Sequence, residues 1–249
     1  MTRRRGDDLG GAVVPGRRAV AELLRAGRRP VRMVSLARSA GRVADELAEL
    51  AAAAGARVRW RDADQLREES GVEATQGVVA RAAPVTPAPL AGLLEREDAF
   101  LVALDGVTDP RNLGAVLRTA LAAGASGAIL PRHRAALLTP AAVKAAAGAV
   151  EHLPVALVGG VATALDQAGR AGVWTVGLDA RGEALVSDLA VADRPLVLVL
   201  GAEDTGLARL VRARCDVVAR VPMPGPVESL NVAAAAAVAC FEVARQRAG

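Results

Sequence analysis

Three short segments, far apart in the chain, carry most of the side chains that could do chemistry. They are Leu104–Ala120, Leu200–Leu207 and Val221–Val232. Each follows a short, unbroken run rich in Leu and Val, the pattern of a strand buried on both faces of a parallel sheet. The ligand crevice of an open α/β sheet lies outside the carboxyl ends of its strands. The sequence therefore predicts that the three segments converge on one site.

The first segment contains Asp109-Pro-Arg-Asn112, which predicts a turn with Asn112 as the cap of the helix that follows. Arg111 and Arg118 lie seven residues apart, so two helical turns place them on one face. A guanidinium beside a helix start suits phosphate recognition. Two solvated arginines on a surface helix would produce the same pattern.

The second segment places Glu203 three residues beyond an apolar strand, between Gly201 and Gly206. A carboxylate in this position either receives donors from a ligand or caps the next helix. The segment lacks the Lys-Ser/Thr of a P-loop, and no G-x-G-x-x-G follows a strand of this chain. Nucleoside triphosphates and dinucleotides are therefore disfavoured as ligands.

The third segment contains Pro222-Met-Pro-Gly-Pro226, which cannot form regular structure because proline fixes φ and lacks a backbone donor. Ser229 and Asn231 follow it, at the start of a long helix. Either side chain suits a ligand contact, and either suits an N-cap.

Apolar periodicity predicts alternating strands and helices in two domains. We expect a basic flexible tail over residues 1–12, a small α/β domain over residues 13–82, a proline-rich linker over residues 83–97 and a larger α/β domain over residues 98–249. In the larger domain, strands separated by helices must pair in parallel. Two of the helices expected there cover residues 113–123 and 140–150.

Charge is distributed unevenly along the chain. Residues 1–82 hold 16 arginines against 11 acidic residues, a net charge of +5, whereas the remainder carries −1. A basic first third suits a surface that faces a polyanion, and it also suits a solvated charged face. Two Phe, two Trp and no Tyr disfavour base stacking on aromatic rings. Any contact with RNA would therefore depend on charge and backbone groups.

Cys215 and Cys240 stand alone, without a C-x-x-C pattern, so a disulfide framework and a zinc site are disfavoured. The basic N-terminus is not followed by an apolar segment of the kind found in signal peptides. The apolar stretch Val232–Val243 is shorter than the roughly 20 residues that span a bilayer. We expect a soluble, cytoplasmic protein with no metal and no membrane segment.

Together, three motifs resemble those of the SpoU (TrmH-like) family of RNA ribose 2′-O-methyltransferases: N-x-G-x-x-x-R-T-A, then L-G-A-E with a Gly three residues on, then P-M-x-G with S-L-N-V. Pro-Gly-Arg-Arg-Ala-Val-Ala-Glu-Leu-Leu and Thr-Gln-Gly-Val-Val-Ala in the first domain are similar to the L30e-like substrate-binding domain of the rRNA branch. The resemblance implies a trefoil-knotted (SPOUT) catalytic domain, bound S-adenosylmethionine and a homodimer with its pocket near the interface.

Carried onto matching positions, the resemblance implies specific site residues. The catalytic pocket would contain Asn112, Arg118, Glu203, Ser229 and Asn231, and the cofactor would contact Gly201, Val221 and Leu230. Arginine is effectively never deprotonated in proteins, so Arg118 is expected to bind phosphate and stabilise the developing alkoxide rather than act as a base. Asp204 stands where the family often has a second glycine, so the substrate is less well defined than the reaction.

The resemblance implies a guanosine of 23S rRNA as the leading target, because rRNA modifiers of the family carry the additional N-terminal domain. Three alternatives share the same motifs or fold: an rRNA methyltransferase that confers antibiotic resistance, a tRNA 2′-O-methyltransferase and a non-catalytic RNA-binding protein. The intact set of five pocket residues argues against the last of these.

Overall fold

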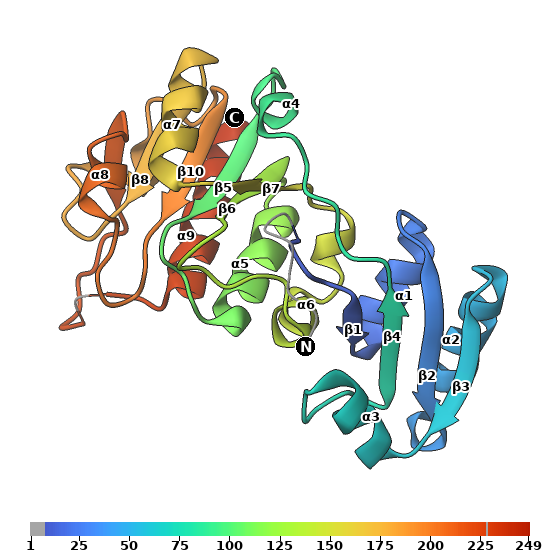
Figure 1. Cartoon of the computed structure of the whole chain (residues 1–249). Helices are drawn as coiled ribbons and strands as arrows, with labels where there is room; N and C mark the ends of the chain where they lie inside the picture. Colours follow the sequence, from blue (N-terminus) through green and yellow to red (C-terminus); the bar gives the residue numbers. More distant parts are fainter. Residues whose placement is uncertain (1–7, 228) are drawn as a thin grey trace.

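The computed structural model describes residues 8–227 and 229–249, which form two α/β domains (Figure 1). The smaller domain comes from the N-terminal third of the chain and the larger domain from the rest. Residues 8–12 and 83–89 both cross between the two domains, so the domains are joined by two stretches of chain.

The N-terminal domain is built on a four-stranded sheet in the order β1-β4-β2-β3. The β1–β4 and β4–β2 pairs are antiparallel, and the β2–β3 pair is parallel. Helix α1 is capped at its C-terminus by Gly27, whose φ of 60° is the left-handed conformation that glycine adopts without strain. The elements are β1 (Val13–Pro15), α1 (Arg17–Ala26), β2 (Val31–Ala37), α2 (Arg42–Ala53), β3 (Arg57–Arg61), α3 (Ala63–Ser70) and β4 (Val78–Ala82).

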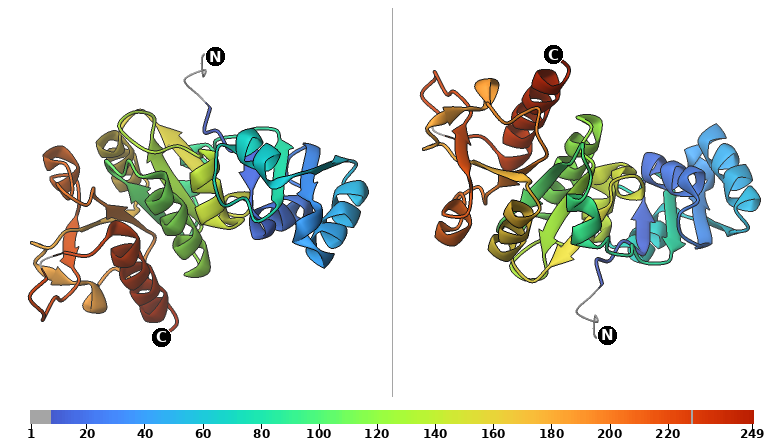
Figure 2. Two further views of the ribbon diagram at one scale, coloured as in Figure 1. Left: turned by 90° about the horizontal axis from the view of Figure 1, so that it is seen from below. Right: turned by 90° about the horizontal axis from the view of Figure 1, so that it is seen from above.

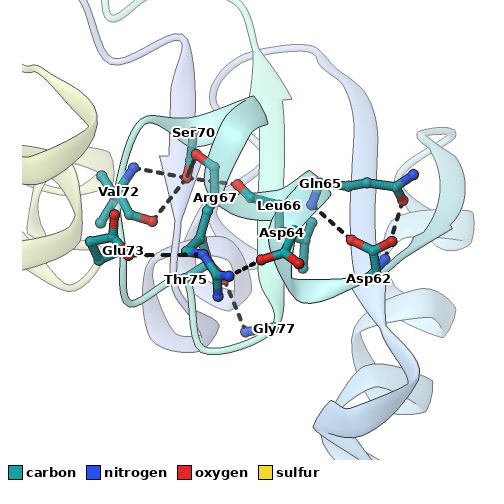
Figure 3. A network of polar contacts seen from close by, with 10 residues as sticks. All are labelled: Asp62, Asp64, Gln65, Leu66, Arg67, Ser70, Val72, Glu73, Thr75 and Gly77. Atoms are coloured by element: carbon teal, nitrogen blue, oxygen red, sulfur yellow. Dashed lines mark hydrogen bonds and ion pairs between the residues drawn. The ribbon is translucent and has the colours of Figure 1, made fainter.

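Helix α3 is fixed by contacts within its own sequence (Figure 3). The Asp62 carboxylate accepts a hydrogen bond from the backbone N–H of Gln65 at 2.8 Å, and the Gln65 side chain accepts one from the backbone N–H of Asp62 at 3.2 Å. This reciprocal capping box satisfies two donors at the helix start. Arg67 pairs with Asp64 and lies 3.8 Å from a Glu73 oxygen. The polar residues of this segment therefore serve local structure.

The C-terminal domain is built on a seven-stranded sheet in the order β7-β6-β5-β10-β8-β11-β9, and all of its pairings are parallel. The expected α/β class is confirmed. The strands are β5 (Phe100–Leu104), β6 (Gly127–Pro131), β7 (Val155–Val158), β8 (Trp174–Leu178), β9 (Ala184–Leu185), β10 (Leu196–Leu200) and β11 (Val217–Arg220). The helices are α4 (Leu90–Leu94), α5 (Pro110–Ala122), α6 (Pro140–Ala146), α7 (Val161–Arg170), α8 (Arg209–Arg212) and α9 (Val232–Arg247).

Helices cover both faces of this sheet (Figure 1). Phe100 and Val102 of β5 belong to the core that packs against α5, α6 and α9. Leu101 and Ala103, the alternate residues of the same strand, belong to a second core against α4, α7 and α8. Because successive strand residues point to opposite apolar layers, these strands read as unbroken apolar runs.

Helix α5 begins earlier than the sequence predicted. It starts at Pro110, and Asp109 is its N-cap, since the Asp109 carboxylate accepts a hydrogen bond from the backbone N–H of Arg111 at 2.6 Å. Proline at the first helical position lacks only a donor that would be unsatisfied there. The prediction that Asn112 caps this helix was therefore wrong. Asn112 lies inside the first turn, and its side chain makes a different contact.

Helix α6 is shorter than the predicted helix over residues 140–150. It ends at Ala146, because Ala147 adopts a left-handed conformation with φ of 50° and Gly148 follows with φ of 99°. A 3₁₀ turn then covers Ala149–Glu151. A Cβ at position 148 would lie 2.5 Å from the Cβ of Glu22, so glycine permits the close approach of α1 to this turn.

The segments that cross between the domains are held by backbone hydrogen bonds. The expected flexible tail falls partly outside the described residues, but Leu9 is fully buried and its carbonyl accepts a hydrogen bond from the N–H of Leu138 at 2.9 Å. In the proline-rich segment, Val85 donates to the carbonyl of Gly10 at 2.9 Å. Residues 8–12 are thus part of the packed structure, since an apolar side chain there is buried at the domain junction.

A buried ion pair joins the two domains. Arg29, in the loop after α1, donates two hydrogen bonds to the Glu151 carboxylate, with its Nε 2.9 Å from Oε2. The same guanidinium donates to the carbonyls of Gly11, at 2.7 Å, and Ala83. The two side chains are 8% and 2% exposed. We call these contacts the Arg29 clamp. Through the buried Arg29 guanidinium, the clamp links residues 8–12, residues 83–89 and the two domains.

Cys215 and Cys240 are free thiols, as the sequence predicted. Burial raises the pKa of each to about 12, and the neighbouring Asp216 carboxylate adds to the shift at Cys215. Neither thiol is ionised at neutral pH, so neither is prepared to act as a nucleophile. Within the described residues, no helix has the length and apolar character needed to cross a membrane.

Candidate active site

A cavity of about 760 Å³ lies at the carboxyl ends of β8, β10 and β11. The loops that follow these strands form its walls. Gly201, Val221 and Leu230, expected from the sequence to contact a cofactor, all line it, and so do Glu203 and Ser229. The second and third predicted segments therefore meet at one cavity.

Glu203 is the centre of a hydrogen-bonded cluster at the edge of this cavity. Its Oε1 accepts hydrogen bonds from Asn112 Nδ2 at 2.9 Å, from Asn231 Nδ2 and from the backbone N–H of Val232 at 3.3 Å. Asn231 Nδ2 also lies 3.2 Å from Asn112 Oδ1, to which it donates. We call Asn112, Glu203 and Asn231 the Glu203 cluster. It brings the first predicted segment to the other two.

Asn231 makes two contacts at the start of α9, and one of them is the N-cap that the sequence offered as an alternative. Its Oδ1 accepts a hydrogen bond from the backbone N–H of Ala233 at 2.9 Å, which makes Asn231 the N-cap of α9. Its amide nitrogen donates to Glu203 at the same time. The helix start therefore fixes the orientation of this amide. Glu203 in turn accepts from the backbone N–H of Val232, which has no acceptor in the first turn of the helix.

The loop after β10 is closed tightly on itself. Ala202 and Gly206 exchange backbone hydrogen bonds of 3.1 and 2.9 Å. A Cβ at position 201 would lie 2.3 Å from the carbonyl carbon of Gly206, so only glycine fits there. Asp204 is exposed at the tip of this loop and lines the cavity. Its carboxylate is therefore part of the rim.

Four charged residues of the cavity wall were missed by the sequence analysis: Asp179, Arg181, Arg209 and Arg212. Arg212 Nη1 lies 3.0 Å from Asp179 Oδ2, and Arg212 Nη2 donates to the carbonyl of Arg181 at 3.3 Å. Asp179 and Arg181 lie just beyond β8, so the rule that ligands bind at the carboxyl ends of parallel strands would have found them. They give one wall of the cavity a polar, charged character.

Arg118 lies apart from the Glu203 cluster. It follows Asn112 by six residues on α5, which corresponds to about 9 Å along the helix axis and about 120° around it. Arg118 is exposed and lines a second cavity, between the two domains. In Figure 2 the N-terminal domain lies on one side of α5 and α6, and α8 and α9 lie on the other. A single chain therefore does not bring Arg118 to the other four predicted catalytic residues.

The described residues contain no group of three or more His, Cys, Asp and Glu side chains that could hold a metal ion. The polar groups at the cavity are amides, carboxylates, guanidiniums, the hydroxyls of Thr205 and Ser229, and backbone atoms.

A parallel sheet with a loop-walled cavity at its carboxyl edge, joined to a smaller domain, places this protein among the α/β proteins that bind a ligand at the strand ends. Residues 99–241 match the SpoU rRNA Methylase family, and residues 13–88 match the family described as RNA 2'-O ribose methyltransferase substrate binding. The chain belongs to the SpoU rRNA methylase family. The reaction class expected from its motifs, enzymatic methyl transfer to an RNA ribose, is confirmed.

Relatives and solved structures agree with this assignment. A Burkholderia protein named 23S rRNA (guanosine-2'-O-)-methyltransferase RlmB is 47% identical over 201 residues, covering 80% of this chain and 81% of that protein. A Bacillus subtilis protein named putative TrmH family tRNA/rRNA methyltransferase YacO is 36% identical, covering 94% and 95%. The SpoU methyltransferase AviRb from Streptomyces viridochromogenes, solved with AdoMet, superposes with a TM-score of 0.79 at 30% identity, covering 95% and 90%.

Proposed function

We propose that this protein transfers a methyl group from S-adenosylmethionine to the ribose 2′-OH of a guanosine in 23S ribosomal RNA. The Glu203 cluster at the edge of a cavity of cofactor size carries this proposal. The name of the Burkholderia relative and the AdoMet in the Streptomyces structure support it. A ribosomal RNA substrate implies that the protein acts in the cytoplasm.

The cavity suits S-adenosylmethionine in size and in lining. Its volume of about 760 Å³ lies within the range of small-molecule pockets. Val221 and Leu230 offer apolar surface, and the missing side chain of Gly201 lets backbone approach backbone. These three residues would hold the cofactor, largely through backbone atoms. The bound sulfonium supplies a methyl group that is already activated for transfer.

The residues of the chain then have to align the 2′-OH with the methyl group and remove its proton. Three donors already converge on one oxygen of Glu203, so we assign this carboxylate to orienting the amides of Asn112 and Asn231. Ser229 lines the cavity and positions the ribose or the cofactor. Arg118 binds the adjacent phosphate and stabilises the developing alkoxide, while the proton leaves through phosphate or water.

This role requires Arg118 to come from a second copy of the chain, because within one chain it lies apart from the cavity. We therefore propose a homodimer. Helix α9 presents an exposed apolar stripe of Ala234, Val238 and Phe241, of which Val238 is 43% and Phe241 52% exposed. The stripe begins one turn beyond Asn231, so a second copy packed on it would lie beside the cavity.

Mapping ribose methylation in RNA from cells with and without the gene tests the substrate. We expect one 23S rRNA guanosine to lose its 2′-O-methyl group without the gene and to regain it with the wild-type gene, but not with Glu203→Gln. A lost methyl group in tRNA, or no lost methyl group, would contradict the proposed target. Calorimetry on the purified protein should show S-adenosylmethionine binding, and methyl transfer should be unchanged by EDTA.

Mixed dimers test the origin of Arg118. Arg118→Ala and Asn231→Ala should each abolish methyl transfer when expressed alone. When the two variants are expressed together, a mixed dimer contains one site with an intact Asn231 and an intact Arg118 from the other copy. Activity should therefore return. No recovery in mixed dimers isolated with two different affinity tags would refute the shared site.

A further inference from the structure

A second cavity, of about 600 Å³, lies between the two domains. Helices α1 and α2 of the N-terminal domain form one wall. Helix α5 and the turn that follows α6 form the other. Four arginines line it: Arg17, Arg18, Arg25 and Arg118. This cavity has no part in the cofactor site, which lies at the carboxyl edge of the sheet.

Two of these arginines, one on each wall, are available to a ligand. Arg18 on α1 and Arg118 on α5 are both exposed, and within residues 8–227 and 229–249 neither has a carboxylate at ion-pair distance. By contrast, Arg17 Nε donates to the carbonyl of Gln76 at 3.0 Å, and Arg25 pairs with Glu22 at 3.0 Å. The cavity therefore presents two unpaired guanidiniums that face it from different domains.

The two carboxylates of the cavity are already occupied. Glu22 accepts hydrogen bonds from Arg25 and lies 3.0 Å from His152 Nε2, while Glu46 pairs with Arg42 at 3.1 Å. Four arginines against two paired carboxylates leave the lining positive. A bound anion would gain charge-assisted hydrogen bonds without displacing an existing ion pair.

The remainder of the lining is apolar. Leu47 and Leu50 of α2 face Leu121 and Ala122 of α5 across the cavity. An apolar surface beside unpaired guanidiniums matches a nucleotide, whose base is flat and whose phosphates are charged. RNA recognition commonly uses unstacked bases, and an arginine plane serves as a stacking partner where aromatic rings are lacking.

We propose that this interdomain cavity binds one unstacked nucleotide of the substrate RNA, with its base on the apolar wall and its flanking phosphates on Arg18 and Arg118. This inference rests on the proposed RNA methyltransferase function and adds a substrate subsite to it. Arg118 is also the residue proposed to reach the target ribose in the active site of the second copy. The nucleotide bound in the interdomain cavity therefore lies close to the methylated nucleotide along the RNA.

Contacts between the two domains fix the relative positions of the cavity walls in the absence of RNA. The Arg29 clamp ties the N-terminal domain to Glu151, and Gly148 lets the backbone after α6 contact Glu22 of α1. A preformed site loses less conformational freedom on binding than a hinge between mobile domains. The interdomain cavity is therefore preformed for binding.

The test compares the RNA affinity of the full-length wild-type protein with that of Ala122→Glu and Arg18→Gln. The probe is a 23S rRNA fragment that contains the target guanosine, and affinity is measured as a function of salt concentration. Ala122 is exposed in the cavity, so a glutamate there opposes phosphate without removing any arginine. We expect Ala122→Glu to weaken binding at least ~10-fold and Arg18→Gln to weaken it ~5–10-fold, lowering the salt slope by about one.

Matched controls separate this site from general charge. Ala122→Gln has the same size as the glutamate variant without its charge, and Arg32→Gln removes an exposed arginine of the same domain that lies outside the cavity. Both should bind RNA within twofold of wild type. S-adenosylmethionine affinity should be unchanged in all four variants, which also reports that they are folded.

Equal binding by Ala122→Glu and Ala122→Gln, or equal losses for Arg18→Gln and Arg32→Gln, would overturn the subsite while the methyltransferase function stands. Failure of the unmodified protein to bind or methylate the fragment would overturn the proposed function and this subsite with it. Crosslinks from 4-thiouridine in the RNA to α1 or α5 would support the subsite.

Discussion

The two cavities of this protein are constructed in opposite ways. The cavity at the sheet edge is formed by loops of one domain, and its polar side chains satisfy one another through Glu203. The interdomain cavity is formed by helices of two domains and leaves Arg18 and Arg118 unpaired among the described residues. A site that aligns reacting atoms needs its groups held in place, whereas a site that grips a polyanion needs its charges free.

The largest effect is expected on the free energy of unfolding, when the buried ion pair of the domain junction is broken. Glu151→Leu leaves the Arg29 guanidinium buried without its carboxylate, a change that typically costs about 3–5 kcal/mol. Urea unfolding should show this loss. RNA affinity should fall, while S-adenosylmethionine affinity of the folded protein stays the same. A stability change below about 1 kcal/mol would show that the clamp does not hold the domains together.

The next largest effect is expected at the first cavity. Glu203→Gln replaces the charged acceptor of the Glu203 cluster with an amide that presents its own donors to Asn112 and Asn231. The single-turnover methylation rate should fall by about 100–1,000-fold, the span seen when one preorganised electrostatic contact is removed. RNA affinity should stay within twofold. The neighbouring Asp204→Asn is the control, and an equal loss there would contradict a special role for Glu203.

In our proposals Arg118 acts both at the active site of the second copy and in the interdomain cavity. Its substitution therefore tests how the two cavities are connected. Lysine keeps the charge but loses the planar fork that can hold a phosphate with two hydrogen bonds. Arg118→Lys should lower the single-turnover rate at saturating RNA at least ~100-fold, with little change in cofactor affinity. A rate near that of wild type would leave Arg118 as a surface residue of α5.

The smallest effect concerns the contact between Glu22 and His152 across the domain junction. The hydrogen bond from His152, followed by that from Arg25, lowers the pKa of Glu22 from its usual 4.5. Because the folded protein holds this carboxylate ionised, the contribution to stability is complete above pH 4.5 and is lost as the pH falls through the lowered pKa. Glu22→Gln should lower Tm by about 1–2 °C at pH 7.

This difference should disappear in acid, and calorimetric melts of both proteins between pH 3 and pH 7 would measure it. A gap that widens towards pH 3 would have the wrong sign and would contradict the assignment of Glu22.

Local patterns predicted much of the fold. The apolar runs that lead into the three segments form strands β5, β10 and β11, as predicted, because each is a compact apolar run followed by turn residues. The start of α5 was misjudged, since Asn112 and Asp109 are both good caps and the choice depended on Pro110. The trefoil knot was implied only by family resemblance, because threading of the chain leaves no local signal.

Local patterns also predicted part of the candidate site. Glu203 and Asn231 could be placed because strand ends of a parallel sheet share one edge. The position of Arg118 away from them depends on the rotation of α5, and the second cavity depends on how two domains dock. Arg29 and Glu151 lie 122 residues apart and read as ordinary charges until the fold buries them together.

The Arg29 clamp has a consequence for exchanging parts between related enzymes. The proline-rich segment looks like a natural crossover point for chimeras, yet the guanidinium binds Gly11 before the domain, Ala83 after it and Glu151 deep in the partner domain. A transplanted N-terminal domain would therefore bring a buried cation to a host that must already supply a carboxylate at position 151 and a glycine at 148. An exchange of the N-terminal domain would therefore have to keep the buried ion pair between Arg29 and Glu151.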